Sequence, residues 1–186
     1  MKDYSGKRFG KGYAFCGANL TGCIFDQSYL RLVNFEGSKL RSASLKRAHL
    51  PLAFLQNVQA QKTNFFWANL TKAKCQGGNF TDADFFCAIA KEVDFTNADL
   101  SDCNFMDVDL SGADLRGATL AGTCFAKANL VGAKFSAIAM AGCDLSGATL
   151  SKTKQLQIYL FKKYVVLRDK LAKMYWGPMQ NESATA

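Results

Sequence analysis

The sequence predicts a solenoid, a fold in which short repeated units stack along one axis, followed by a single helix. A large apolar residue returns at every fifth position from Phe15 to Leu150, and a small residue lies two positions before nearly every one of them. A period of five matches neither the 3.6 residues of a helical turn nor the alternation of a strand. A fixed period of this kind indicates a stack of units that each contact only their neighbours. After Leu150 the period stops and helical spacing replaces it.

The repeat runs without insertion or deletion through residues 13–150. Leu or Phe occupies 24 of its 28 central positions, and the exceptions are Ala60, Cys75, Ala90 and Met140. The residue two before the centre is Ala, Cys, Ser, Thr or Val in 25 of the 28 cases. So constant a phase over this length indicates one continuous repeat domain.

The repeated motif is a small residue, then Asp or Asn, then Leu or Phe, then two variable residues. It is seen in Ala18-Asn19-Leu20, Ala68-Asn69-Leu70, Ala98-Asp99-Leu100, Ala113-Asp114-Leu115 and Ala128-Asn129-Leu130. This motif resembles that of the pentapeptide-repeat family. The resemblance implies an all-β solenoid, a right-handed quadrilateral β-helix in which four pentapeptides form one coil of twenty residues. The repeat region would then form about seven coils.

In such a coil the central residues point inward and stack over residues twenty positions away. One interior column is then nearly all aromatic, and it consists of Phe25, Leu45, Phe65, Phe85, Phe105, Phe125 and Leu145. The residue two before each centre must also fit inside, which explains its small size. The other three positions of each five face water, so we expect functional side chains in the outward columns.

Two segments depart from the regular frame. In residues 1–12, Tyr4 and Phe9 keep the five-residue spacing but lie one residue out of phase with Phe15. We interpret this segment as a partial starting coil or a cap, because a stack of strands otherwise ends in an open edge. In the middle, Pro51 lacks a backbone donor, and we expect a local bulge or bend between it and Trp67.

Residues 154–176 are predicted to form a helix. Apolar residues recur there at spacings of 4, 3, 4 and 3, at Leu160, Tyr164, Leu167, Leu171 and Met174, and Trp176 widens the stripe. Gly177 and Pro178 end the helix, and residues 177–186 are predicted to be a disordered tail. The stripe could cap the last coil, form a homodimer contact or lie on a membrane surface, in that order of preference.

The formal charge of +8 is unevenly distributed. Residues 1–12 carry four basic and one acidic group, and residues 151–186 carry seven basic and two acidic groups. Between them, residues 13–75 carry eight basic and two acidic groups, whereas residues 76–114 carry one basic and nine acidic groups. This polarity argues against general binding of nucleic acid, which a uniformly basic surface would favour.

Outward apolar residues predict a protein-binding surface. Because residues twenty apart stack, Phe66, Phe86 and Met106 should form an external column with Trp67 beside it. A second group joins Leu32 with Leu52, and Tyr29 with His49, with Phe54 close to them. An exposed apolar column on a soluble rod is typical of a partner surface, unless a loop or the terminal helix covers it. The favoured function is therefore a non-enzymatic protein-binding or scaffold module, with a partner of unknown identity.

An acidic belt supports an alternative function. Asp82 should stack with Asp102, and Asp94 with Asp114. The resemblance implies this alternative, because some family members resemble duplex DNA and bind type II topoisomerases such as gyrase, which protects these enzymes from quinolones or toxins. A simpler interpretation is that Asp is the usual residue before the centre and caps turns, since a DNA mimic should be acidic overall.

A basic cluster lies on the first coils and consists of Arg31, Lys39, Arg41, Lys46 and Arg47. It could meet an acidic partner, although a solvated face is the simpler interpretation. Nucleic acid is a weaker candidate, because the cluster has little of the aromatic interleaving that single-strand binders use.

Catalytic and cofactor chemistry have almost no support in the sequence. His49 is the only histidine, no glycine-rich phosphate loop is present, and no two of the seven cysteines are twenty residues apart or form a CxxC pair. We therefore expect no enzyme, no metal, no cofactor and no disulfide framework. Free thiols and a start without an apolar signal segment suggest a cytoplasmic protein, although a transit peptide removed earlier would leave no trace.

Overall fold

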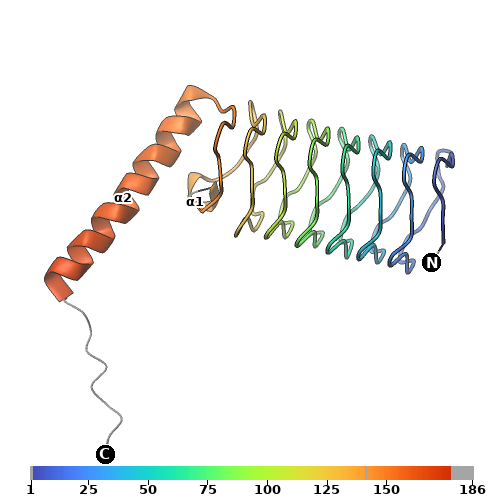
Figure 1. The fold of residues 1–186 in the computed structure, drawn as a ribbon, viewed down its shortest axis with the longest axis horizontal. Helices are drawn as coiled ribbons and strands as arrows, with labels where there is room; N and C mark the ends of the chain where they lie inside the picture. Colours follow the sequence, from blue (N-terminus) through green and yellow to red (C-terminus); the bar gives the residue numbers. More distant parts are fainter. Residues whose placement is uncertain (1, 141, 177–186) are drawn as a thin grey trace, which may run out of the picture.

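The computed structural model describes residues 2–140 and 142–176, with side chains described through residue 168 apart from that of residue 138. The chain forms a straight rod of stacked coils, with two helices at its C-terminal end (Figure 1). The predicted tail at 177–186 lies outside the described residues, as do the side chains of Leu171 and Trp176.

Parallel β-bridges hold the coils together. Each joins a residue to the one twenty positions later, from Ala14 with Asn34 to Asn129 with Thr149. The bridging residue is the one before each centre, and backbone N–H groups on both sides of it donate to the neighbouring coil, as Leu50 does to Asn69 O at 2.7 Å. The ladder therefore repeats with the period that a twenty-residue coil predicts. The count of about seven coils stays a prediction.

Each group of five residues has one local structure. The centre and the residue two before it are buried, and the two residues after the centre form a turn. The turn is closed by the next interior N–H, as when Val33 N donates to Leu30 O at 3.1 Å. The second turn residue has a left-handed backbone, with φ near +57° at Trp67 and +59° at Leu52. Since only Gly and Asn adopt this conformation readily, side chains that occupy it come at a cost in backbone energy.

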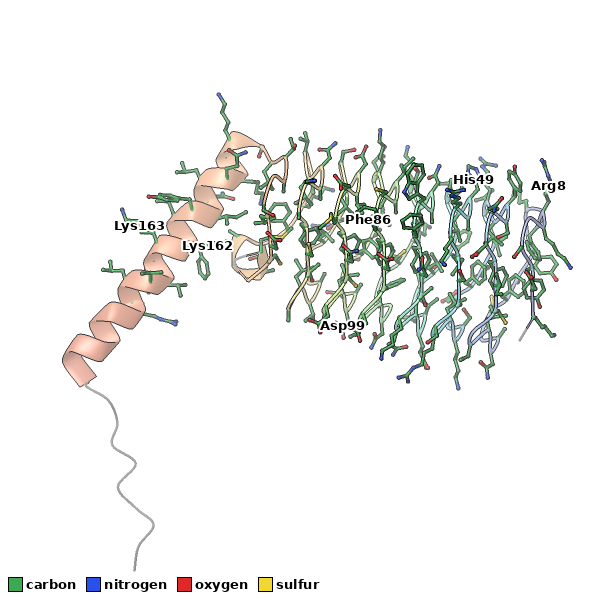
Figure 2. All side chains as sticks on the ribbon, viewed as in Figure 1. Arg8, His49, Phe86, Asp99, Lys162 and Lys163 are labelled. Atoms are coloured by element: carbon green, nitrogen blue, oxygen red, sulfur yellow. The ribbon has the colours of Figure 1, made fainter. Side chains whose placement is uncertain are left out.

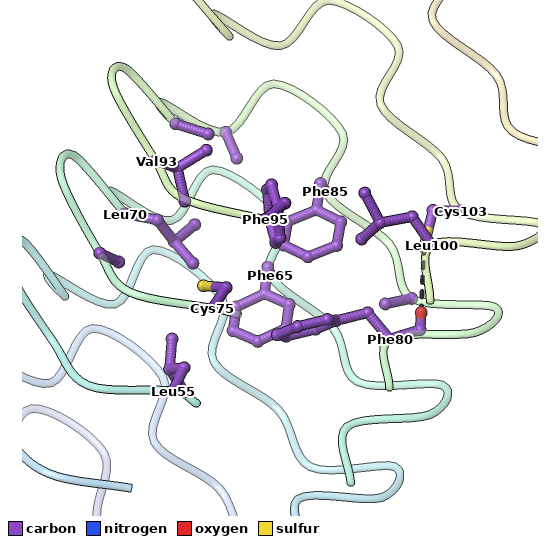
Figure 3. Packing of buried hydrophobic residues seen from close by; sticks show 14 of the residues in the cluster. Leu55, Phe65, Leu70, Cys75, Phe80, Phe85, Val93, Phe95, Leu100 and Cys103 are labelled. Atoms are coloured by element: carbon purple, nitrogen blue, oxygen red, sulfur yellow. Dashed lines mark hydrogen bonds between the residues drawn. The ribbon is translucent and has the colours of Figure 1, made fainter. Parts of the chain in front are cut away.

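The interior is a continuous apolar core along the rod axis. In the predicted aromatic column, the rings of Phe65, Phe85, Phe105 and Phe125 stack with centroid separations of 4.7, 4.6 and 5.3 Å and interplanar angles below 10°. Figure 3 shows part of this packing around Phe65 and Phe85. The stack continues over four coils because the coils are in register.

Polar side chains at one interior column bond to the coil below. The hydroxyls of Thr63 and Thr123 donate to Leu40 O and Leu100 O at 2.7 and 2.9 Å. The thiol of Cys103 donates in the same way to Phe80 O at 3.0 Å (Figure 3). Thr and Cys are therefore tolerated inside because each has a carbonyl acceptor at hand.

The N-terminal segment adds to the ladder with a different offset. Asp3 bridges Ile24 and Arg8 bridges Tyr29, a separation of 21 residues instead of 20. Tyr4 takes the place of a centre and stacks on the ring of Phe25 at 4.8 Å. The phase slip seen in the sequence is thus one extra residue inserted before Phe15, and the segment covers the first complete coil.

The expected bulge after Pro51 is absent from the structure. The bridges from Asn34 to Phe54 and from Lys39 to Gln59 keep the twenty-residue offset through this region. Pro51 is the first residue of a corner turn, where its fixed φ is favoured and its missing N–H is not required by the ladder. Pro51 O still accepts a hydrogen bond from Leu32 N at 3.2 Å.

Two helices close the C-terminal end. Helix α1, Ala137–Met140, replaces one side of a coil while keeping Met140 buried. Helix α2, Lys152–Trp176, begins two residues before the predicted start, next to Ser151, whose hydroxyl accepts the Lys154 N–H at 3.4 Å. It contacts α1 and extends away from the rod (Figure 1).

The face of α2 that packs on the rod is not the predicted stripe. Ile158 is 5% exposed and joins the core, whereas Leu160, Tyr164 and Leu167 are each at least 54% exposed. Lys154, one turn before Ile158, donates from Nζ to Phe135 O at 2.9 Å. The expectation that the Leu160 stripe caps the last coil is therefore wrong in its face.

Candidate functional site

The predicted external column is present at one corner of the rod. Phe66 and Phe86 directly follow the interior centres of successive coils, and their rings stack at 5.7 Å with an interplanar angle of 19°. Trp67 lies 6.2 Å from Phe66 and is 55% exposed. Met106 occupies the same position one coil further and is half-buried. The four residues thus form one apolar ridge, here called the Phe66 ridge.

Cations border the N-terminal end of the ridge. A shallow cleft of about 230 Å³ lies there, lined by Asp26, Gln27, Lys46, Arg47 and Phe66. The guanidinium carbon of Arg47 is 5.8 Å from the ring centre of Trp67. Asp26 Oδ1 accepts the Ser44 hydroxyl at 2.5 Å and the Lys46 N–H at 3.0 Å. This carboxylate therefore serves the local turn.

The next face of the rod carries a second row of cationic and aromatic groups. The guanidinium of Arg8 lies 4.4 Å from the ring centre of Tyr29, and the Tyr29 ring lies 6.2 Å from that of His49. Arg8 and His49 lie on the same side of the rod in Figure 2. The sequence showed Tyr29 over His49 but missed Arg8, because the 21-residue offset hides its place in the column. The expectation of little aromatic interleaving is thereby corrected.

The structure does not join Leu32, Leu52 and Phe54 to the Phe66 ridge. Leu32 and Leu52 are half-buried at the following corner, where both have a left-handed φ. Phe54 lies on the face beyond that corner, half-buried beneath the Lys74 ammonium at 5.2 Å from its ring centre. These residues form a separate and flatter apolar strip.

The acidic residues do not form one belt. Asp94 and Asp114 bridge each other on one face, while Asp82 and Asp102 occupy corner positions beyond the neighbouring face. Asp99, on that intervening face, points away from the side that carries His49 (Figure 2). Four separate carboxylates at two sites give a weaker and more divided negative surface than the sequence suggested.

The Asp residues before the centres cap the turns that follow them. Asp94 Oδ1 accepts the Thr96 N–H at 3.0 Å, and Asp99 Oδ1 accepts both the N–H and the hydroxyl of Ser101 at 3.0 and 2.7 Å. Asp114 in addition receives Arg116 Nη2 at 2.6 Å, and this side-chain hydrogen bond lowers the pKa of Asp114. Lys134 Nζ lies 3.8 Å from the same carboxylate. Much of the acidic charge is thus used locally.

The described residues offer no site for a metal ion. They contain no group of three His, Cys, Asp or Glu side chains placed to hold one. All seven cysteines are free, and Cys16 is the one that is fully exposed. Burial raises the pKa of the Cys143 thiol to about 11 and that of Cys75 well above its ordinary value. Of the helices in the described part of the chain, none has the length and apolarity needed to span a bilayer.

Helix α2 carries an apolar row that no described residue covers. Leu156, Tyr159, Leu160, Tyr164 and Leu167 are each more than half exposed. They lie on the side of the helix opposite Ile158, since residues two or nine positions apart along a helix point in very different directions. The helix thus has two apolar faces, of which one packs on the rod.

Solved structures of similar shape belong to one kind of protein. QnrB1, a plasmid-mediated fluoroquinolone resistance protein, is 20% identical, with 86% of this chain and 82% of QnrB1 covered and a TM-score of 0.63. Rfr23 from the cyanobacterium Cyanothece 51142 is 21% identical over 75% of this chain and 88% of its own, with a TM-score of 0.38. A search of curated proteins returned no match.

The sequence also matches a family profile over most of its length. The profile described as pentapeptide repeats matches in eight copies, over residues 14–47, 63–102, 103–138 and 128–154. The ladder of twenty-residue coils and the likeness to QnrB1 agree with that assignment. The chain therefore belongs to the pentapeptide-repeat family, whose members fold as right-handed quadrilateral β-helices.

Proposed function

We propose that this protein is a non-enzymatic protein-binding module that presents the Phe66 ridge to a partner. The observation that carries the proposal is the stack of Phe66 on Phe86 beside an exposed Trp67. Aromatic residues of this kind dominate the energetics of protein interfaces when a partner desolvates them. An apolar ridge left open to water on a repeat rod is typical of a recognition surface.

The rod holds this ridge in a fixed shape. The backbone N–H groups of Leu45, Arg47 and Trp67 all donate to carbonyls of the next coil, at 2.7, 2.8 and 3.0 Å. The interior stack of Phe65 on Phe85 lies directly beneath, with a centroid separation of 4.7 Å. A surface that is ordered before binding loses less conformational entropy when a partner docks. Rigidity thus favours a scaffold or docking role.

The Phe66→Ser/Phe86→Ser double variant tests the proposal. Affinity capture from native lysate, with quantitative mass spectrometry, should show a set of proteins retained by the parent chain and lost by the double variant. Val131→Ser is the matched control, since it removes another exposed apolar side chain from the rod. An unchanged set of captured proteins, with both variants folded by circular dichroism, would show that the ridge is not the binding surface.

The exposed row of α2 is proposed as a contact for self-assembly. Its residues Leu160, Tyr164 and Leu167 form an apolar strip several turns long on the side away from Ile158. Two copies of such a helix can bury their strips against each other at an interaxial distance of about 8–10 Å. Light scattering after size-exclusion chromatography should show a dimer that Leu160→Ser/Leu167→Ser converts to a monomer.

Modulation of a type II topoisomerase is the second candidate, and the fold shared with QnrB1 is the observation that favours it. The division of the acidic residues and the pairing of Asp114 with Arg116 weigh against it. A supercoiling assay with purified gyrase, with and without a quinolone, decides the point. No effect of this protein at any concentration up to a large excess over the enzyme would end this candidacy.

A further inference from the structure

We propose that the segment bound by the Phe66 ridge is an acidic one, with its carboxylates over Lys46, Arg47 and Arg8 and an apolar side chain on Phe66 and Phe86. This inference rests on the proposed function and specifies the chemistry of the partner. It depends on the charges that surround the ridge, which are arranged asymmetrically along the rod.

The cations at the N-terminal end of the ridge have no carboxylate partner within the described chain. Residues 1–75 carry twelve basic and three acidic groups. The ion pairs formed among the described residues all involve cations further along the rod, namely Lys72, Lys91, Arg116 and Lys134. The positive charge around the cleft is therefore available to a ligand.

Two guanidinium groups are held in place without using their N–H donors on protein acceptors. Arg47 lies on Trp67 and Arg8 lies on Tyr29, at 5.8 and 4.4 Å from the ring centres. In the part of the chain that the structure describes, neither guanidinium donates a hydrogen bond. A stacked guanidinium presents its planar fork of donors to solvent, which matches the geometry of a carboxylate. The aromatic contacts thus orient the arginines for an anionic ligand.

The charge reverses along the same corner, which limits the ligand to a short acidic segment. Lys46 and Arg47 precede the ridge, whereas Asp107 follows Met106 at its other end, and Asp84 lies on the adjoining face. Residues 76–114 carry nine acidic groups and one basic group. A nucleic acid that continued along the ridge would bring its phosphates onto these carboxylates. A peptide can place carboxylates at one end and an apolar side chain in the middle.

A random library of twelve-residue peptides, selected on immobilised full-length protein, tests the inference. The retained peptides should be enriched several-fold in Asp and Glu on one side of a large apolar residue. In the Lys46→Glu/Arg47→Glu variant that acidic enrichment should disappear. The matched control is Lys39→Glu/Arg41→Glu, which makes the same change in charge on other columns of the same coils and should leave the enrichment unchanged.

Fluorescence then places the selected peptides on the surface. The chain has two tryptophans, so Trp176→Phe leaves Trp67 as the single reporter. A selected acidic peptide should change the Trp67 emission of this variant, and the change should be weaker at high salt. A labelled twelve-nucleotide thymidine strand serves as the nucleic-acid probe, and we expect no binding above that of the Lys46→Glu/Arg47→Glu variant.

The outcomes separate this inference from the proposed function. Retained peptides that lose binding in Phe66→Ser/Phe86→Ser but show no acidic enrichment would overturn the inference and leave the protein-binding function intact. Failure to retain any peptide that depends on Phe66 and Phe86 would overturn both. Binding of the thymidine strand that requires Lys46 and Arg47, but not Lys39 and Arg41, would assign the cationic face to nucleic acid instead.

Discussion

Gly78 and Phe80 share one space inside the rod. A Cβ atom built on Gly78 would lie 2.6 Å from Cε2 of Phe80 and 3.2 Å from Cγ2 of Val58. The complete coils have Leu at the position of Phe80, apart from Ala60 in the coil before it. The large ring of Phe80 thus follows the smallest centre of its column and takes the place of a side chain at residue 78. The two irregular positions in the sequence are parts of one packing solution.

We predict that Gly78→Ala destabilises the fold by about 1–3 kcal/mol, because the added methyl group must displace the Phe80 ring in a closely packed core. Chemical denaturation followed by circular dichroism measures this change. Phe80→Leu in the same chain should relieve much of the penalty, since Ala98 with Leu100 shows the smaller pair one coil further. Simple addition of the two single effects would contradict a shared space.

The cysteines should differ sharply in their reactivity. Cys16 is exposed, whereas Cys75, Cys103 and Cys143 are buried, and burial raises the pKa of each of these three thiols. Since the thiolate is the reactive form, a maleimide at neutral pH should label Cys16 first and leave the buried three unlabelled until the chain unfolds. Peptide mapping by mass spectrometry measures the order. Early labelling of Cys103 would show that the rod opens locally.

Helix α2 illustrates what the sequence could not decide at the scale of an element. Its helical period was clear, but the sequence contains two apolar rows that differ by two residues in phase, one through Ile158 and one through Leu160. Either could pack on the last coil, since hydrophobic spacing alone does not say which way a helix turns. The choice depends on α1, whose helical turn changes the shape of the rod end and was itself hidden in a regular five-residue frame.

We predict that Ile158→Ser lowers the melting temperature, because it places a hydroxyl in the core at a cost of about 2–5 kcal/mol. Leu160→Ser is the matched control, two residues away and 54% exposed, and should leave the melting temperature of the monomer unchanged. Differential scanning calorimetry at low protein concentration measures both variants. Equal destabilisation by the two substitutions would mean that α2 packs through its other row.

At the scale of the whole molecule, the sequence predicted the rod well because one physical rule repeats along it. The burial of every centre and the stacking of Phe66 on Phe86 both follow from the twenty-residue coil. What escaped prediction needed three-dimensional detail. The place of Arg8 depended on one inserted residue, and the separation of Asp82 from Asp94 depended on the corners that divide the faces. The regular fit of Pro51 could have been anticipated from its position in a turn.

The turn-capping aspartates predict how the rod responds to acid. The Ser101 hydroxyl lowers the pKa of Asp99, and Arg116 lowers that of Asp114, relative to the ordinary aspartate value of 3.8. Because the folded pKa lies below the unfolded one, these groups stabilise the fold above the ordinary value, and this stability is lost as the pH falls through the lowered values. The melting temperature should therefore be nearly constant near neutral pH and fall below about pH 4.

Circular dichroism melts at a series of pH values measure this response. Ser101→Ala removes the hydroxyl that Asp99 accepts at 2.7 Å, so the acid-dependent part of the stability should become smaller in this variant. Ser111→Ala provides a comparison on another face, where Asp109 caps its own turn. A fall of the same size in Ser101→Ala and in the parent chain would show that other carboxyl groups carry the acid response.

The twenty-residue offset of the β-bridges makes the orientation of every surface a matter of counting. Removing one whole coil between Phe66 and Phe86 would shorten the rod and keep all later faces aligned. Removing a single pentapeptide would instead rotate everything that follows by a quarter turn about the rod axis, although each centre would still point inward. Evolution can therefore lengthen this rod only in steps of four repeats if it is to preserve a binding edge, whereas a core without an edge could grow by one.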